Sequence, residues 1–517
     1  MLPALQQYFS IFPVRSLNGA YKTNPKPEFT FSNWMSGKFQ DSLTQYLNDN
    51  IGFRPIMIRS KNQIEFSLFG KTHASGSIIG KNNWLYEYDY LREYKGEDYI
   101  GNSIIDRRIR MFKFLQMHLK KTKNIDLILV LEPNKVSTYP EYLPESYSRH
   151  RQTPSNYETY ISKIRQYEVR YIDFDAYFRE IKDQVSYPLY PQYGIHWSEY
   201  GAYLVADSIL HYIENLRNIK FPFPIVDSIE VSRIPRSTDF DIGKTLNLLI
   251  SLSLKQNLAY PVYHFGRMAD SLKPMVLTIS DSYYWNIFNT RIPKNLYKNE
   301  AFWYFNSRVV PDSYFKETKV KELDFRKEIE KQDVIFVMLT NRYLYKFDWG
   351  WTSNAYFLYA KYPDYYRKRI MYENNIFGYE QWFNDILEKS MIHKIPLQKQ
   401  LNYDIDYLYK KDLKNEFLKY DILTDVKKKI KQTPQWFNLI KTKAEKRNIS
   451  IDSMLTISAL YLVNDTTNEK YKDARLLLKA KDKISRDSIK EINTLMQKYY
   501  LNRDEAILLL AEKALNN

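Results

Sequence analysis

The sequence predicts an α/β protein in which helices flank a parallel sheet, followed by a helical C-terminal module. Short continuous runs of Ile, Val and Leu favour strands that are buried on both faces, as in parallel sheets covered by helices. Helical segments separate these runs, and alternating strands and helices are typical of an open α/β sheet. Beyond about residue 396 the composition shifts to long Lys-, Glu- and Leu-rich stretches, which predict helices.

The first 70 residues predict a linker followed by a helical segment. Residues Leu17 to Thr30 contain two prolines and predict an extended linker. The stretch from Phe31 to about Phe69 predicts helix, because apolar residues recur four apart on one face. These residues are Phe39, Leu43 and Leu47.

Residues 71–395 contain the elements of the predicted sheet. The four strands are predicted at Ile125–Leu131, Val169–Phe174, Met275–Ile279 and Val334–Leu339. The helices are predicted at Ile104–Lys121, Ser155–Tyr167, Ser198–Leu216 and Lys316–Lys331. Ligands of open α/β sheets bind beyond the carboxyl ends of the strands, so the residues directly after each strand are the candidates for chemistry.

Residues 396–517 predict a helical module without a titratable cluster that suggests chemistry. Thr433 and Pro434 fit an N-cap and a first helical residue. The further helical runs are Ser453–Val463, Ser488–Tyr499 and Asp504–Leu515. We expect this module to serve packing, with docking of a partner as the alternative.

Composition excludes several classes of protein. The chain has 517 residues, 44% of them hydrophobic and 26% charged, as in ordinary globular proteins. Cysteine is absent, which excludes disulfide scaffolds and zinc–thiolate sites. No apolar stretch is long enough for a transmembrane helix. The net charge of +16 and the 46 tyrosines are compatible with an anionic partner and with stacking on sugar rings. Compositional drift is the favoured explanation, because the basic residues form no dense block.

The motifs of the common cofactor and metal sites are missing from the sequence. The chain has 14 glycines and neither of the glycine-rich patterns that hold nucleotide phosphates. None of its seven histidines has the spacing of a metal-binding pair. We therefore predict no cofactor, no metal and, in the absence of a nucleic-acid motif, no nucleic-acid partner.

Two short segments carry residues suited to acyl transfer. His196 lies in the segment YGIHWSEYG, directly before a predicted helix that Ser198 can cap. Ser282 lies in TISDSYY, where a buried strand runs into a polar turn. A serine hydroxyl is a poor nucleophile until a histidine takes its proton, so the two segments need each other.

Together these segments resemble the alginate O-acetyltransferase family (AlgX/AlgJ-like), a branch of the SGNH-hydrolase-like fold. GIHW at 194–197 resembles the family's D-x-H-W motif, and SDSY at 280–283 resembles its G-D/T-S-F motif. Further resemblances are GKNNWLY at 80–86, NIGFR at 50–54, PNK at 133–135 and TNR at 340–342. The resemblance covers roughly residues 30–350.

The resemblance implies a function and roles for six residues. Ser282 would be the nucleophile, with its backbone N–H in the oxyanion hole, and His196 would be the general base. Substrate-binding roles would fall to Asn341, Arg342, Trp197 and Tyr283. The protein would O-acetylate a cell-surface or secreted polysaccharide outside the cytoplasm and close to a membrane, beside a membrane-bound O-acyltransferase partner. An N-terminal anchor that precedes the present Met1 would fit this placement.

One residue departs from the family pattern in a way that bears on mechanism. Where the family has an aspartate two residues before the histidine, this chain has Gly194. That carboxylate orients the imidazole and stabilises the imidazolium. Three explanations are open. A carboxylate from elsewhere in the chain, such as Glu132, Asp173 or Asp175, replaces it, the site works as a Ser–His dyad, or the domain is a glycan-binding pseudoenzyme. A carbohydrate esterase of the same fold is a further alternative, because it shares the acyl-enzyme.

Overall fold

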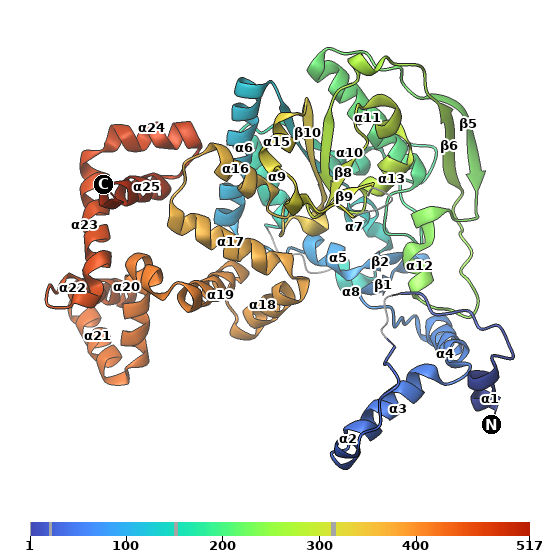
Figure 1. Cartoon of the computed structure of the whole chain (residues 1–517), viewed down its shortest axis with the longest axis horizontal. Coiled ribbons are helices and arrows are strands. Elements are labelled where there is room, and N and C mark those ends of the chain that lie inside the picture. Colours follow the sequence, from blue (N-terminus) through green and yellow to red (C-terminus); the bar gives the residue numbers. More distant parts are fainter. Residues whose placement is uncertain (1, 20–22, 149–153, 312–316, 517) are drawn as a thin grey trace.

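The computed structural model describes residues 2–19, 23–148, 154–311 and 317–516. It shows an α/β body, with short helices from the N-terminus at one end and a group of C-terminal helices at the other (Figure 1). Within the described residues, no helix combines the length and the apolar character required to cross a bilayer.

The stretch from Phe31 to about Phe69, which was predicted to be helical, forms separate helices, and a further helix, α1, precedes the predicted linker. Their bounds are Leu2–Phe9 for α1, Phe31–Met35 for α2, Lys38–Asn50 for α3 and Arg54–Phe69 for α4. The chain breaks where Gly37 and Phe53 adopt left-handed conformations, with φ of 80° and 64°. In the predicted linker from Leu17 to Thr30, the described residues form no helix or strand, and residues 20–22 lie outside the described residues.

A six-stranded sheet forms the centre of the α/β body, in the order β4-β3-β10-β7-β8-β9. The strands are β3 (Asp126–Glu132), β4 (Tyr171–Asp173), β7 (Val276–Ser280), β8 (Phe302–Tyr304), β9 (Arg308–Val310) and β10 (Val334–Thr340). All neighbouring pairs are parallel except β8 and β9. The predicted parallel sheet is confirmed, and its four predicted strands are β3, β4, β7 and β10.

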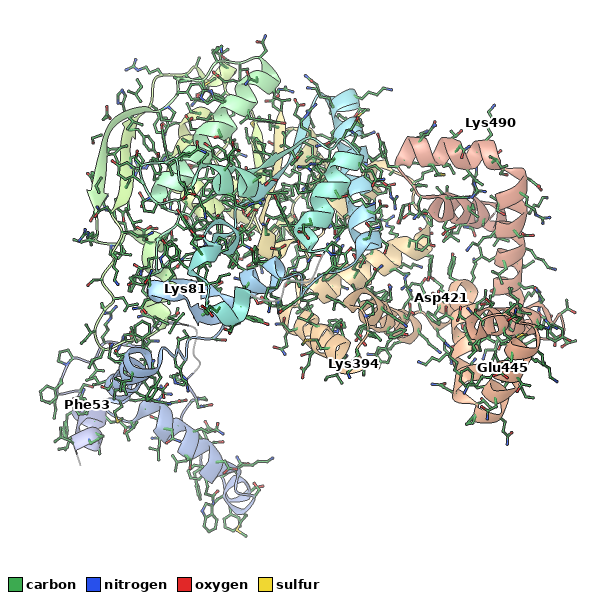
Figure 2. All side chains as sticks on the ribbon, turned by 180° about the vertical axis from the view of Figure 1, so that it is seen from behind. Phe53, Lys81, Lys394, Asp421, Glu445 and Lys490 are labelled. Atoms are coloured by element: carbon green, nitrogen blue, oxygen red, sulfur yellow. The ribbon has the colours of Figure 1, made fainter. Side chains whose placement is uncertain are left out.

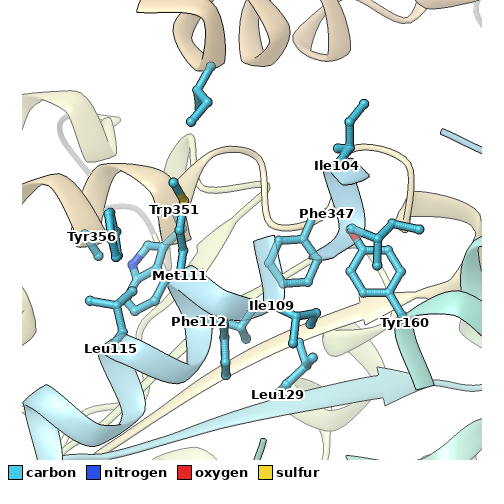
Figure 3. Close-up of a cluster of buried hydrophobic side chains, with 14 of the residues drawn as sticks. Ile104, Ile109, Met111, Phe112, Leu115, Leu129, Tyr160, Phe347, Trp351 and Tyr356 are labelled. Carbon is cyan, nitrogen blue, oxygen red and sulfur yellow. The ribbon is translucent and has the colours of Figure 1, made fainter. Parts of the chain in front are cut away.

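Both faces of the two central strands are buried, which explains their continuous apolar sequences. On β3, Leu127, Leu129 and Leu131 belong to one core cluster, whereas Ile128 and Val130 belong to the other. The same alternation holds on β10. Figure 3 shows part of the first core, where Ile109 and Phe112 pack with Phe347 and Tyr160 beside the sheet.

Helices cover both faces of this sheet. Those of the body are α5 (Tyr88–Tyr94), α6 (Asn102–Lys123), α7 (Lys135–Thr138), α8 (Glu145–Ser148), α9 (Asn156–Gln166), α10 (Phe174–Ile181), α11 (Glu199–Arg217), α12 (Asp241–Thr245), α13 (Tyr284–Asn289), α14 (Ile292–Leu296), α15 (Phe325–Glu330) and α16 (Trp351–Tyr359). Two antiparallel ribbons complete it, β1 (Ser77–Ile79) with β2 (Leu85–Glu87) and β5 (Ile225–Ser232) with β6 (Leu258–His264).

One predicted helix of the body is wrong in extent. Instead of a helix over Lys316–Lys331, the structure has a 3-10 turn at Val320–Glu322 and the short α15. Asp324 starts α15, because its side chain accepts a hydrogen bond from the Lys327 N–H. Lys316 itself lies outside the described residues.

The C-terminal part of the chain is helical from Asp364 onward. Its helices are α17 (Asp364–Gly378), α18 (Glu380–His393), α19 (Leu397–Asp412), α20 (Lys414–Gln432), α21 (Pro434–Lys446), α22 (Ile451–Asn464), α23 (Lys472–Asp487), α24 (Ile489–Tyr499) and α25 (Arg503–Asn516). Helices α20 to α23 share a hydrophobic core of their own. The domain boundary predicted at residue 396 falls between α18 and α19 and stays a prediction.

Buried charges tie this helical part to the α/β body. Arg110 on α6 forms an ion pair with Glu505 on α25, at 2.8 Å between Nη1 and Oε2. Both side chains are about 5% exposed. Arg110 also donates to the Tyr500 carbonyl and pairs with Asp106, so its guanidinium has partners on both sides of the junction.

Replacing Arg110 by alanine should therefore destabilise the fold. It leaves the Glu505 carboxylate buried without its partner, which costs about 3–5 kcal/mol. Urea unfolding followed by circular dichroism measures the loss. Arg486→Ala is the control, because Arg486 and its partner Asp482 are both about 69% exposed and should contribute little. Equal effects of the two substitutions would contradict the assigned role of Arg110.

Candidate active site

The carboxyl ends of β3, β10 and β7 lie side by side, because these strands are parallel neighbours. Asp281 follows β7 and is fully buried. Its Oδ2 accepts hydrogen bonds from the amide and the hydroxyl of Thr340 at the end of β10, both at 2.9 Å. Its Oδ1 accepts from the Tyr283 amide, also at 2.9 Å. The turn that presents Ser282 is thus fixed to the neighbouring central strand.

Ser282, His196 and Asp241 form a hydrogen-bonded chain at this edge of the sheet. The Oγ atom of Ser282 lies 2.9 Å from Nε2 of His196. On the other side of the ring, Nδ1 lies 2.6 Å from Oδ2 of Asp241. The His196 side chain is 14% exposed and that of Asp241 is 27% exposed, so solvent reaches the chain. These are the geometry and residue types of a Ser–His–Asp triad.

Asp241 is the residue that the sequence analysis missed. It is the first residue of α12, and its Oδ1 accepts hydrogen bonds from the Ile195 and Ile242 amides, at 2.8 and 2.7 Å. The Tyr193 carbonyl accepts a further bond from Gly243. Tyr193 and Ile195, the two neighbours of Gly194, are therefore both hydrogen-bonded to α12.

Gly194 explains how the acid reaches this place from a distant segment. A Cβ atom at Gly194 would lie only 2.5 Å from the Thr238 carbonyl oxygen and 3.0 Å from the carbonyl carbon of Asp239. The backbone before Asp241 thus occupies the space that a side chain at position 194 would need. The same packing arrangement therefore excludes a carboxylate at position 194 and places the carboxylate of Asp241 beside the histidine.

Two of the three carboxylates suggested for this role lie elsewhere. Asp173 caps α10, where its carboxylate accepts from the Ala176 amide and from the Tyr157 hydroxyl. Asp175 accepts from the Asn134 amide, and burial raises its pKa to about 6. Neither is recorded in contact with the imidazole.

Glu132, the third suggested carboxylate, is fully buried at the end of β3. Burial and the neighbouring charge of Asp281 raise the pKa of Glu132 well above its usual range. Its Oε1 accepts a hydrogen bond from the Ser280 hydroxyl at 3.4 Å. Glu132 therefore supports the strand ends and does not orient the histidine.

Trp197 and Tyr283 were predicted to contact substrate, and the structure places both side chains inside the protein. Both side chains are fully buried, so neither ring has a free face for a sugar. The Tyr283 hydroxyl donates to the Ile195 carbonyl at 2.6 Å, and the Trp197 indole donates to the Tyr283 carbonyl at 3.2 Å. The two rings join the histidine segment to the serine segment.

Lys135 holds the histidine segment in place through hydrogen bonds to backbone carbonyls. Its ammonium group is buried and donates to the carbonyls of Leu85, Gln192 and Gly194, at 2.8, 3.0 and 2.7 Å. Three acceptors match the three N–H donors of an ammonium group. The side chain also lies 5.0 Å from the Trp84 ring centroid. Burial lowers the pKa of Lys135, and the nearby carboxylates oppose this shift.

Arg342 is linked to the triad through Glu87, a carboxylate whose pKa responds to burial, to Arg342 and to the charges of Asp241 and His196. Its guanidinium donates to Glu87 and Asp89, at 2.7 and 2.8 Å. Burial raises the pKa of Glu87, Arg342 lowers it, and the charges of Asp241 and His196 also act on it. A substrate-binding role of Arg342 stays a prediction that this placement permits.

Asn341 faces a different cavity. Its side chain is buried, and Oδ1 has no hydrogen-bond partner among the described residues. The cavity has a volume of about 210 Å³, and its lining includes Ser137, Asp175 and Arg179 but not Ser282. The described residues show no hydrogen bond between the Asn341 side chain and the triad, and its substrate-binding role stays a prediction.

One segment of the α/β body matches a known family model. Residues 78–221 match the family model described as SGNH hydrolase-like domain, acetyltransferase AlgX. This segment contains His196, whereas Ser282 and Asp241 lie beyond it. The similarity to the AlgX-type SGNH hydrolase-like domain is therefore shown for residues 78–221. The recognition of this family from the short motifs is confirmed.

Solved structures with similarity to the chain include AlgJ, AlgX and PatB1. The O-acetyltransferase domain of Pseudomonas putida AlgJ has a TM-score of 0.36 and 17% identity, covering 54% of this chain and 98% of its own. Pseudomonas aeruginosa AlgX has a TM-score of 0.33 and 16% identity, covering 51% and 62%. Bacillus cereus PatB1 has a TM-score of 0.33 and 13% identity, covering 52% and 97%. The curated proteins contain no match.

The triad assignment predicts a large effect of Asp241→Asn on the rate of acyl transfer. Asparagine keeps the shape of the side chain but favours the wrong imidazole tautomer, which lowers kcat by about 10⁴ in serine proteases. Hydrolysis of a chromogenic acetyl ester measures the rate. Asp173→Asn is the matched control and should retain most of the activity. A large loss with Asp173→Asn and none with Asp241→Asn would contradict the assignment.

The packing at Gly194 predicts that even alanine is not tolerated there. Gly194→Ala should lower the free energy of unfolding by about 1–3 kcal/mol through overpacking. It should also lower the esterase rate, because the 238–241 segment must move away from His196. Thermal unfolding and the ester assay measure both effects. Gly378→Ala is the control, since a Cβ there has no atom within 4 Å. Full activity of Gly194→Ala would contradict the proposed packing.

Proposed function

We propose that this protein is a polysaccharide O-acetyltransferase that works through an acetyl-serine intermediate on Ser282. The observation that carries the proposal is the hydrogen-bonded chain Ser282–His196–Asp241, next to a segment that matches the AlgX-type acetyltransferase domain. The chain supplies a nucleophile, a base and an acid to orient the base.

In the first half of the reaction, Oγ of Ser282 attacks the acetyl carbonyl of the donor. Nε2 of His196 takes the hydroxyl proton as the new C–O bond forms. Negative charge develops on the carbonyl oxygen. The backbone N–H of Ser282 would donate a hydrogen bond to this oxygen, since it has no other acceptor among the described residues. The tetrahedral species collapses, His196 returns the proton to the leaving group, and acetyl-Ser282 remains.

In the second half, a sugar hydroxyl replaces the leaving group. Its oxygen attacks the acetyl-Ser282 carbonyl while His196 takes its proton. Collapse breaks the bond to Ser282, whose Oγ regains the proton, and the acetyl group leaves on the sugar. An esterase would use water at this step. The pseudoenzyme alternative rested on the missing acid at position 194, and Asp241 removes that reason.

We also propose an extracytoplasmic place beside a membrane-bound O-acyltransferase that supplies the acetyl group. The support in the structure is the exposed apolar surface of the N-terminal helices. Side chains on it that are at least 45% exposed include Leu2, Phe9, Phe31, Trp34, Met35 and Leu68. Such a surface is typical of contact with a membrane or a membrane protein.

Intact-mass spectrometry after incubation with a chromogenic acetyl ester tests the nucleophile. We expect one added acetyl group on the wild-type protein and none on Ser282→Ala, because only the wild type has the attacking hydroxyl. Asp241→Asn should accumulate the adduct more slowly. An adduct on Ser282→Ala, or none on folded wild type with any acetyl ester, would contradict the mechanism.

The acceptor is tested with the same ester and a polysaccharide. A transferase should release less free acetate when the acceptor is added and should leave O-acetyl groups on the recovered glycan. Acetate release that does not change with acceptor would identify an esterase instead. Ser282→Ala provides the background for both measurements.

A further inference from the structure

A cavity in the helical C-terminal module lies far along the chain from the triad. Its volume is about 520 Å³, within the usual range for ligand pockets. Helices α19 and α20 line it, and neither Ser282 nor His196 takes part. Figure 2 shows this module beside the α/β body, with Asp421 of α20 labelled.

Helix α19 presents a tyrosine face to the cavity. Its lining residues are Tyr403, Asp406, Tyr407 and Lys410, which recur at the spacing of one helix face. Tyr403 is 51% exposed and Tyr407 is 68% exposed. Rings this exposed contribute little to the packing of the protein core. Their flat apolar faces are suited to stacking on the C–H-rich face of a sugar ring.

Helix α20 presents a lysine face to the same cavity. Its lining residues Thr424, Lys427, Lys428 and Lys431 follow the same one-face spacing. Lys427 has one partner, the exposed Asp452 at 3.4 Å. For Lys428 and Lys431 the structure records no ion pair within the described part of the chain.

The two acidic residues in the lining are already neutralised. Asp425 is 4% exposed and pairs with Lys410 and with Lys429, at 2.5 and 2.7 Å. Asp406 pairs with Arg369 on α17 at 2.5 Å. The cavity therefore combines exposed aromatic rings with an excess of positive charge.

We propose that this cavity binds a segment of an acidic polysaccharide, with sugar rings on Tyr403 and Tyr407 and anionic groups on Lys427, Lys428 and Lys431. The choice of a polysaccharide rests on the proposed function, because a second site on the same chain would keep the acceptor bound to the enzyme. The tyrosine face distinguishes this ligand from a simple anion, and the lysine face distinguishes it from a neutral glycan.

Isothermal titration calorimetry on the full chain tests the proposal with oligogalacturonates. Their fully methyl-esterified forms are the matched ligands, since they keep the backbone but lack the charge. We expect binding of the acid form, weakening as salt is added, and no measurable binding of the ester. A glycerol phosphate oligomer serves as a further ligand that shows whether phosphate replaces carboxylate.

Variants assign the binding to the two helix faces. Tyr403→Ala with Tyr407→Ala, and Lys427→Gln with Lys428→Gln and Lys431→Gln, should each weaken binding by about tenfold or more, corresponding to about 1.4 kcal/mol. The control variants change the exposed Tyr461 to alanine, or Lys441, Lys443 and Lys446 to glutamine. These controls should bind within about twofold of the wild type.

The readouts separate this proposal from the proposed function. Ser282→Ala should bind the oligogalacturonate as the wild type does, and the lysine variant should still form the acetyl adduct from a small ester. Equal binding of acid and ester forms, no binding of any anionic glycan, or tighter binding of single-stranded DNA would each overturn the proposal. Control variants that lose binding as much as the cavity variants would overturn it too.

Discussion

The candidate active site depends on one close approach, the contact between Gly194 and the backbone before Asp241. No side chain fits at position 194, because the Thr238 carbonyl oxygen would lie 2.5 Å from its Cβ. This contact brings the start of α12 next to the histidine turn, where Oδ2 of Asp241 lies 2.6 Å from Nδ1 of His196. The triad acid comes from this separate segment, and the close packing at Gly194 takes the space that a local aspartate would need.

Buried polar groups hold the other two members of the site. Lys135 bonds three carbonyls around the histidine segment, and Asp281 bonds Thr340 on the neighbouring strand. Buried polar groups are stable only when they are hydrogen-bonded, so these partners restrict both segments to one arrangement. A nucleophile and a base fixed in this way need little rearrangement during the reaction.

The division of roles among the aromatic residues follows from burial. Trp197 and Tyr283 lie beside the triad, but their rings are enclosed and their polar atoms bond the backbone. Exposed tyrosines occur instead in the C-terminal helices, next to lysines of α20. In the proposed scheme chemistry and glycan binding are therefore carried by different parts of the chain, and the acetyl-serine can form without the helical cavity.

The sequence by itself determined the α/β class, the four main strands, and the Ser282 and His196 pair. Continuous apolar runs identify doubly covered strands, and short motifs identify residues that need each other chemically. It did not determine Asp241, which lies 45 residues beyond His196 at the start of the short helix α12, in a segment without a recognisable motif. Nor did it show that Trp197 and Tyr283 are enclosed. Only the tertiary structure decided these points, because contacts between distant segments depend on packing, and local sequence patterns do not record it.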